Sequence, residues 1–183
     1  MKTTEKEIQL LPFELLLAQA TISRRIMEMG SEISSDYQNT VPVLLGVLKG
    51  CVIFMSDLVR QIRTPIEMEF ISASSYRNGM RAGNPVLFED SLAIPLKNRH
   101  VLVVEGIVDT GKTMGEILKT IARQEPASVA IVTLINKPSS RRSPVELKYV
   151  GFTVGNDFLI GYGLDNTQRY RNLPFIGKVI EKK

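Results

Sequence analysis

Two carboxylates and a run of small polar residues lie close together near the middle of this 183-residue chain. Glu105 and Asp109 could hold the hydroxyls of a sugar or a metal ion, and either could move a proton. The apolar run 101–104 predicts a buried strand before the polar segment 109–113, and the pattern of 114–121 predicts a helix after it. Because free N–H groups and the dipole at a helix N-terminus favour anions, this order of elements predicts a phosphate-binding loop.

The same segment also fits a second phosphate-binding pattern. Residues Gly106 to Thr113 match G-x-x-x-x-G-K-[ST], the Walker A motif, which would indicate a GTPase or a kinase. Against that interpretation, Ser139 stands where an Asn-Lys-x-Asp motif starting at Asn136 would need its Asp, and no Asp-x-x-Gly follows Thr113. Both hypotheses stay open at this point, as does a strand–loop–helix corner that binds nothing.

The composition is that of a water-soluble globular protein, with 44% hydrophobic and 23% charged residues. We expect one domain spanning residues 1–183. The net charge of +4 could indicate nucleic acid, but no run of Lys or Arg exceeds a pair and aromatic residues make up only 7%. A small polyanionic ligand explains the charge equally well, so we expect no nucleic-acid partner.

The single cysteine and the apolar run near residue 10 indicate where in the cell the protein is expected. Cys51 is the only cysteine, so an internal disulfide is impossible, which suits a reducing cytoplasm. The apolar run Leu10 to Ala20 contains Glu14 and resembles neither an export signal nor a membrane span. We therefore expect a cytoplasmic protein without a membrane partner.

Hydrophobic patterns predict alternating helices and strands along the chain. The predicted helices are 13–36, 51–62 and 114–121, and the further predicted strands are 41–48, 66–71, 86–94, 128–135, 149–154 and 175–180. The polar, glycine-rich stretch 72–85 predicts a long loop of the kind that often covers a site. Lys49, Asp109 and Lys137 each follow a predicted strand, and open parallel sheets bind ligands at those ends. The three side chains should therefore meet in one crevice.

The segment VVEGIVDTGKT, residues 103–113, resembles the phosphoribosyl-pyrophosphate motif of type I phosphoribosyltransferases. Three other stretches narrow the resemblance to the hypoxanthine-guanine phosphoribosyltransferase family: Leu48-Lys49-Gly50, Ser75-Tyr76, and Phe158 to Asp165. The resemblance covers about residues 41–180. The one departure is Gly106, which stands where the family has a second acid.

The resemblance implies an α/β fold with a mostly parallel twisted sheet flanked by helices. The core would span about 38–155, and the N-terminal segment and about 156–183 would form a small hood. It also implies purine salvage: Mg²⁺-dependent transfer of 5-phosphoribosyl from phosphoribosyl pyrophosphate to hypoxanthine or guanine, giving IMP or GMP and pyrophosphate. A homodimer or homotetramer and a non-proline cis peptide bond in the loop at Lys49 are implied as well.

The resemblance assigns a role to each matching residue. Asp109 would be the catalytic acid/base. The phosphoribosyl group and its 5′-phosphate would be held by Glu105, Gly106, Ile107, Val108, Asp109, Thr110, Gly111, Lys112 and Thr113. The purine would be bound by Lys137, Phe158, Leu159 and Asp165. Pyrophosphate would be bound by Lys49, Gly50, Ser75, Tyr76 and Arg171, and Mg²⁺ by Glu105 and Asp165.

Gly106 leaves a further alternative open, because the loss of a site acid could mark a non-catalytic nucleotide-binding regulator on the same fold. If the chain is an enzyme, the missing acid should impair its handling of ribose. On that basis Gly106→Asp is expected to raise kcat/KM for phosphoribosyl pyrophosphate, provided that the backbone there accepts a side chain.

Overall fold

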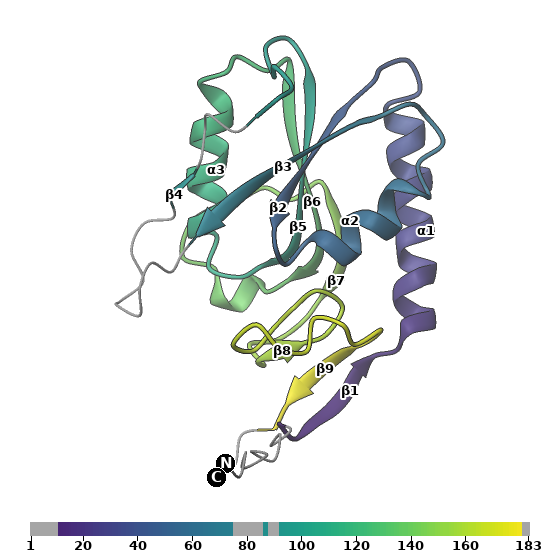
Figure 1. The fold of residues 1–183 in the computed structure, drawn as a ribbon, viewed down its shortest axis with the longest axis vertical. Coiled ribbons are helices and arrows are strands. Elements are labelled where there is room, and N and C mark those ends of the chain that lie inside the picture. Colours follow the sequence, from purple (N-terminus) through teal and green to yellow (C-terminus); the bar gives the residue numbers. More distant parts are fainter. Residues whose placement is uncertain (1–10, 75–85, 88–91, 181–183) are drawn as a thin grey trace, which may run out of the picture.

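The computed structural model describes residues 11–74, 86–87 and 92–180. A six-stranded sheet in the order β4-β3-β2-β5-β6-β7 forms its centre, and all its described pairings are parallel except that of β4 with β3 (Figure 1). The strands are β2 (Val43–Leu48), β3 (Glu67–Ser74), β4 (Val86–Leu87), β5 (His100–Val108), β6 (Ser128–Asn136) and β7 (Tyr149–Thr153). This confirms the predicted mostly parallel α/β sheet.

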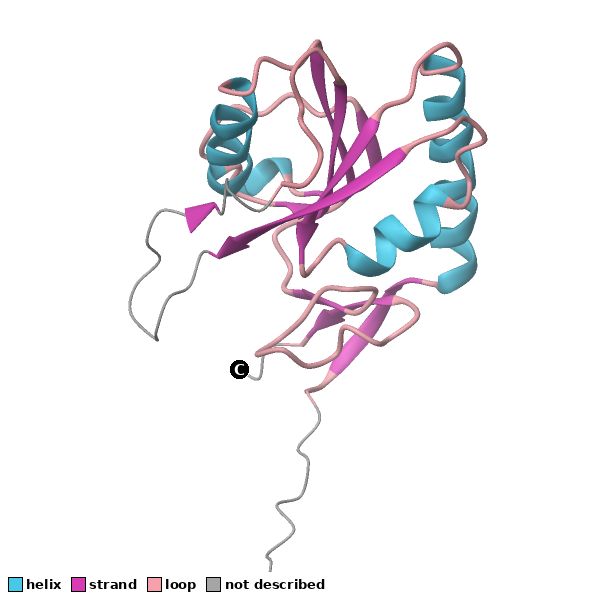
Figure 2. Cartoon of the chain, turned by 45° about the horizontal axis from the view of Figure 1, so that its top comes forward, coloured by secondary structure: helices cyan, strands magenta, loops and turns pink. Residues whose placement is uncertain are grey.

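Helices cover both faces of the sheet (Figure 2). Their bounds are α1 (Gln19–Asp36), α2 (Val52–Val59) and α3 (Lys112–Ala122), and a short 3₁₀ helix spans Pro138–Ser140. Side chains alternate between the faces, as the period of two in a strand requires. Leu44 and Leu102 pack in the cluster under α1 and α2, whereas Val43 and Val101 pack in the cluster under α3.

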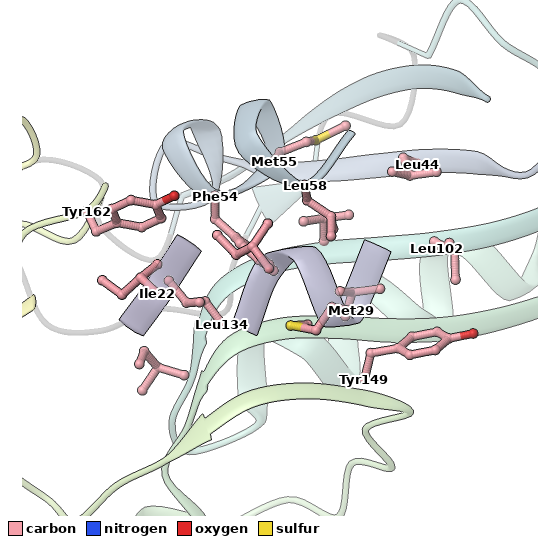
Figure 3. Close-up of a cluster of buried hydrophobic side chains, with 14 of the residues drawn as sticks. Ile22, Met29, Leu44, Phe54, Met55, Leu58, Leu102, Leu134, Tyr149 and Tyr162 are labelled. Carbon is pink, nitrogen blue, oxygen red and sulfur yellow. The ribbon is translucent and has the colours of Figure 1, made fainter. Parts of the chain in front are cut away.

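The cluster under α1 and α2 is closed by large apolar side chains (Figure 3). Ile22 and Met29 of α1 meet Phe54 and Leu58 of α2, and all four are fully buried. Since α2 begins directly after the loop at Lys49, this packing fixes the position of that loop relative to the sheet. Among the described residues, no helix combines the length and the apolarity needed to cross a membrane.

A second, smaller sheet lies beyond one end of the main sheet (Figure 1). It contains β1 (Phe13–Leu17), β9 (Ile176–Val179) and β8 (Leu159–Ile160) in the order β1-β9-β8, with antiparallel pairing. This confirms the hood, but the predicted helix 13–36 is wrong over Phe13–Leu17. The apolar run there has no clear period, and pairing of Phe13 with Val179 draws it into a strand.

Two other predicted elements are shorter than expected. The helix predicted at 51–62 ends at Val59. Of the strand predicted at 86–94, only Val86–Leu87 is strand, residues 88–91 lie outside the described residues, and 92–94 are not part of a strand. β5, in contrast, runs on through Val108, so Glu105 lies within a strand.

Candidate active site

Asp109 and Lys137 meet because β5 and β6 are parallel neighbours whose carboxyl ends are level. Val108 pairs with Asn136, and the N–H of Lys137 donates to the carbonyl of Val108 at 3.0 Å. The Lys137 ammonium therefore lies 3.6 Å from Asp109 Oδ2, and its side chain is only 7% exposed. It also donates to the carbonyl of Asp157 at 3.1 Å. The sequence had predicted that these two side chains converge.

One oxygen of Asp109, Oδ1, is buried and has no hydrogen-bond partner among the described residues. Buried polar atoms are nearly always paired, so an unpaired carboxylate oxygen at the end of a strand indicates a place for a ligand's donor. Asp109 can thus accept a proton from a bound molecule while Lys137 holds its other oxygen in place.

The loop after Asp109 is short and turns directly into α3. Gly111 adopts the left-handed conformation with φ 82° and immediately precedes the first residue of the helix, Lys112. The cavity at this point has a volume of about 250 Å³. It is lined by Val47, Leu48, Glu105, Ile107, Val108, Asp109, Thr110, Gly111, Thr113 and Met114. A helix N-terminus that opens into a cavity with threonine hydroxyls suits a phosphate.

The geometry of β5 argues against the Walker match. A Walker loop needs its Gly-rich residues free to wrap around phosphates after the strand has ended. Here Gly106 to Val108 belong to β5, and only Asp109 to Gly111 form the connection to α3.

Arg141 stabilises this loop, a role that the sequence alone did not indicate. Its guanidinium donates to the side-chain oxygen of Asn136 at 2.6 Å and to the carbonyl of Val108 at 3.3 Å, which ties together the ends of β5 and β6. The backbone N–H groups of Arg142 and Ser143 donate to the carbonyl of Thr110 at 2.9 and 3.1 Å. The only signal in the sequence was an arginine pair shortly after a strand, which on its own looks like ordinary surface.

A second cavity, of about 340 Å³, adjoins the first. It is lined by Lys49, Gly50, Ile107, Asp109, Lys137, Phe158, Leu159, Leu164, Asp165 and Arg171. Ile107 and Asp109 belong to the linings of both cavities. Phe158 is 49% exposed and offers an aromatic face on which a flat ring can stack. Asp109 thus lies at the boundary of two cavities, one suited to a phosphate and the other to a flat ring.

Arg171 and Asp165 form an ion pair at the hood side of the second cavity. Arg171 Nη2 lies 2.8 Å from Asp165 Oδ1, and Arg171 Nη1 donates to the carbonyl of Gly163 at 2.7 Å. Asp165 Oδ2 accepts the N–H of Gln168 at 2.8 Å. A cation on the far side of the cavity from the helix N-terminus is suited to a second anionic group.

The Leu48-Lys49 peptide bond is cis, as the resemblance implied. Glu105 also lies where it was expected, in the first cavity, and its Oε1 accepts the N–H of Gly106 at 2.9 Å. Desolvation by the surrounding protein raises the pKa of Glu105 to about 8. Hydrogen bonds from the backbone N–H groups of Gly106 and Ile107 act in the opposite direction. Ser75 and Tyr76 lie outside the described residues.

The site offers oxygen ligands to a metal but no complete cage. Among residues 11–74, 86–87 and 92–180, no three His, Cys, Asp or Glu side chains gather into a group that could hold an ion. Mg²⁺ is commonly bound by one or two carboxylates together with water and substrate phosphates. Asp165 fits that mode of binding, and Glu105 fits it once its carboxyl has released its proton.

A loop that suits a phosphate and a cavity that suits a flat ring share Asp109, and this arrangement is typical of enzymes that join a phosphorylated sugar to a planar base. The family described as "Phosphoribosyl transferase domain" matches residues 14–167. Hypoxanthine phosphoribosyltransferase of Haemophilus influenzae is 41% identical over 170 residues, which covers 91% of this chain and 95% of that protein. Hypoxanthine-guanine phosphoribosyltransferase of Bacillus subtilis is 39% identical over 164 residues, with coverages of 90% and 91%.

A solved structure agrees with these relatives. The crystal structure of a hypoxanthine phosphoribosyltransferase from Staphylococcus aureus superposes with a TM-score of 0.85 at 37% identity, covering 91% of each chain. The chain therefore belongs to the phosphoribosyltransferase family, among the hypoxanthine-guanine phosphoribosyltransferases.

The raised pKa of Glu105 predicts a pH-dependent stability. Between its ordinary value of 4.5 and about 8, the folded state keeps a proton that the unfolded state has released. The free energy of unfolding should therefore fall as the pH rises through this window. Glu105→Gln should flatten that fall, as measured by urea denaturation from about pH 5 to 8.5. The exposed Glu28→Gln on α1 serves as the control, and equal slopes in the wild type and Glu105→Gln would contradict the prediction.

Proposed function

We propose that this protein transfers the 5-phosphoribosyl group from phosphoribosyl pyrophosphate to hypoxanthine or guanine in purine salvage, giving IMP or GMP and pyrophosphate. The observation that carries the proposal is the position of Asp109, which lies between the two cavities with an unpaired buried oxygen. The family and its relatives support the reaction type and the purine substrates.

The phosphoribosyl group is assigned to the first cavity. The loop from Thr110 to Thr113 and the N-terminus of α3 bind the 5′-phosphate, and Glu105 accepts hydrogen bonds from the ribose hydroxyls. Binding a sugar between these two groups fixes its reacting carbon near Asp109. Such positioning is itself a large part of catalysis.

The purine is assigned to the second cavity. Its ring stacks on Phe158, its edge meets the backbone at Leu159, and its O6 accepts a hydrogen bond from Lys137. Asp109 faces N7 and takes up or returns the proton of the base. A lysine donor suits the oxo group of hypoxanthine and guanine and opposes the amino group of adenine.

Pyrophosphate leaves with concentrated negative charge, and the hood side of the second cavity can neutralise it. Lys49, Gly50 and Arg171 line this cavity, and Ser75 and Tyr76 are proposed to add contacts. Mg²⁺ would be held by Asp165, with Glu105 on the ribose side, and it would supply charge neutralisation of the phosphate oxygens. Release of Asp165 from its ion pair with Arg171 would free both groups for the substrate.

Assembly and location complete the proposal. Exposed apolar side chains on α1 and α2, namely Met27, Val52 and Ile53, support self-association into a homodimer or homotetramer. The single cysteine supports a reducing cytoplasm. We propose no nucleic-acid or membrane partner.

The direct test is an assay of the purified protein with phosphoribosyl pyrophosphate, Mg²⁺ and each purine, run beside GTP and ATP hydrolysis. We expect nucleotide formation from hypoxanthine or guanine, far less from adenine, and loss of activity with excess chelator. Hydrolysis of GTP or ATP without phosphoribosyl transfer to a base would support the Walker hypothesis. Nucleotide binding without either reaction would support a regulator, and full turnover in chelator would remove Mg²⁺ from the mechanism.

Asp109→Asn tests the catalytic role. Loss of the proton acceptor should lower kcat by about a hundredfold to ten-thousandfold, because that is the usual contribution of a general acid or base. Binding of IMP, measured by calorimetry, should change much less. Glu28→Gln again serves as a control that should keep the wild-type rate. An Asn variant within a few-fold of the wild-type kcat would show that Asp109 has another role.

A further inference from the structure

Gly106 lies where β5 passes closest to the loop at Lys49. Pairing with β6 is irregular at this point, since the register records Glu105 with Thr133 and Ile107 with Ile135 but no partner for Gly106. A Cβ atom on Gly106 would lie 2.7 Å from the carbonyl oxygen of Gly50 and 3.1 Å from its carbon. A real Cβ atom essentially never lies within 3.0 Å of a heavy atom from another part of the chain, and here the obstacle is backbone.

Gly163 of the hood also packs closely against this carbonyl. A Cβ on Gly163 would overlap the oxygen of Gly50, and Gly163 has a φ of 94°, which favours glycine. Among the described residues, a Cβ on Gly50 itself would meet only Glu105 Oε1, at 3.7 Å, which is an ordinary contact. The close packing therefore depends on Gly106 and Gly163. We call these two residues, together with the Gly50 carbonyl between them, the glycine socket.

The glycine socket is connected to Arg171, which lines the second cavity. The N–H of Gly163 donates to the carbonyl of Arg171 at 2.9 Å, and Arg171 Nη1 donates back to the carbonyl of Gly163 at 2.7 Å. Lys49, Gly50 and Arg171 line one cavity. A shift of the Gly50 carbonyl would therefore be transmitted to Lys49 and Arg171.

We propose that Gly106 is a positioning residue for pyrophosphate. Its missing side chain lets the Gly50 carbonyl rest against β5 and the hood, which fixes Lys49 and Arg171 for the leaving group. The inference rests on the proposed function, since it assigns the loop to pyrophosphate. The chain lacks the second acid of the family motif at this position, and the backbone of Gly50 fills the space that its side chain would take.

This reverses the expectation for Gly106→Asp. The sequence alone predicted a gain, because the variant restores the acid. In the structure the Asp Cβ meets the Gly50 backbone in the same way as that of Ala, so the loop must move before the carboxylate can reach a ligand. Both substitutions should weaken the use of phosphoribosyl pyrophosphate.

The test compares Gly106→Ala with Gly115→Ala. A Cβ on Gly115, in α3, would have no neighbour within 4 Å among the residues that the structure describes, so this variant carries the same chemical change without the clash. For Gly106→Ala we expect the KM for phosphoribosyl pyrophosphate and the inhibition constant of inorganic pyrophosphate to rise about tenfold, since misplacement by 1 Å can cost up to a hundredfold. The KM for hypoxanthine should stay within about twofold. Gly115→Ala should match the wild type in all three.

The outcomes separate this inference from the proposed function. Inactivity of the wild type with every purine would overturn the proposed function. An active wild type with unchanged constants in Gly106→Ala, or with a gain in Gly106→Asp, would overturn the glycine socket alone. A general loss of folding would lower the apparent kcat and leave both KM values and the inhibition constant unchanged, which would overturn the role in pyrophosphate binding. Equal increases in all three constants would count against a role specific to pyrophosphate.

A second measurement does not depend on any variant. A crystal structure of the wild-type enzyme with inorganic pyrophosphate and Mg²⁺ should show the Gly50 carbonyl still between Gly106 and Gly163, with Lys49 and Arg171 on the ligand. A loop that leaves the glycine socket when pyrophosphate binds would overturn the proposal.

Discussion

The level carboxyl ends of β5 and β6 are the constraint on which the site depends. One backbone hydrogen bond, from the N–H of Lys137 to the carbonyl of Val108 at 3.0 Å, continues the parallel ladder into the two loops. It brings a carboxylate and an ammonium together at the boundary of two cavities. A buried lysine is costly without partners, and here Asp109 and the carbonyl of Asp157 provide them. Arg141 then holds both strand ends in place through hydrogen bonds to Val108 and Asn136.

The hood contributes further residues to the site at the end of the main sheet. It contributes the aromatic Phe158 and the cation Arg171, and its turn at Gly163 packs on the loop at Gly50. Elements from distant parts of the chain therefore meet around one backbone carbonyl. A catalytic site gains from such rigidity, because its groups are already in position when the substrate arrives.

Much of this could be predicted from the sequence, because the signals were local. The valines before Glu105 and the helical pattern after Thr113 fixed the central strand and helix, and parallel topology then implied that Lys137 joins Asp109. Other features depend on packing that a local pattern does not contain. Phe13 to Leu17 form a strand only because β9 lies beside them. Arg141 gains its role only when β5 and β6 are adjacent.

The most direct test of the central claim is a double-mutant cycle on Asp109 and Lys137. If the two side chains act on one bound base, the effects of Asp109→Asn and Lys137→Met should be coupled. We expect the loss of kcat/KM for hypoxanthine in the double variant to be smaller than the product of the single losses by about tenfold, which is typical of contacting residues. Single losses that multiply to within about twofold would show that the two groups act independently, and would contradict the account.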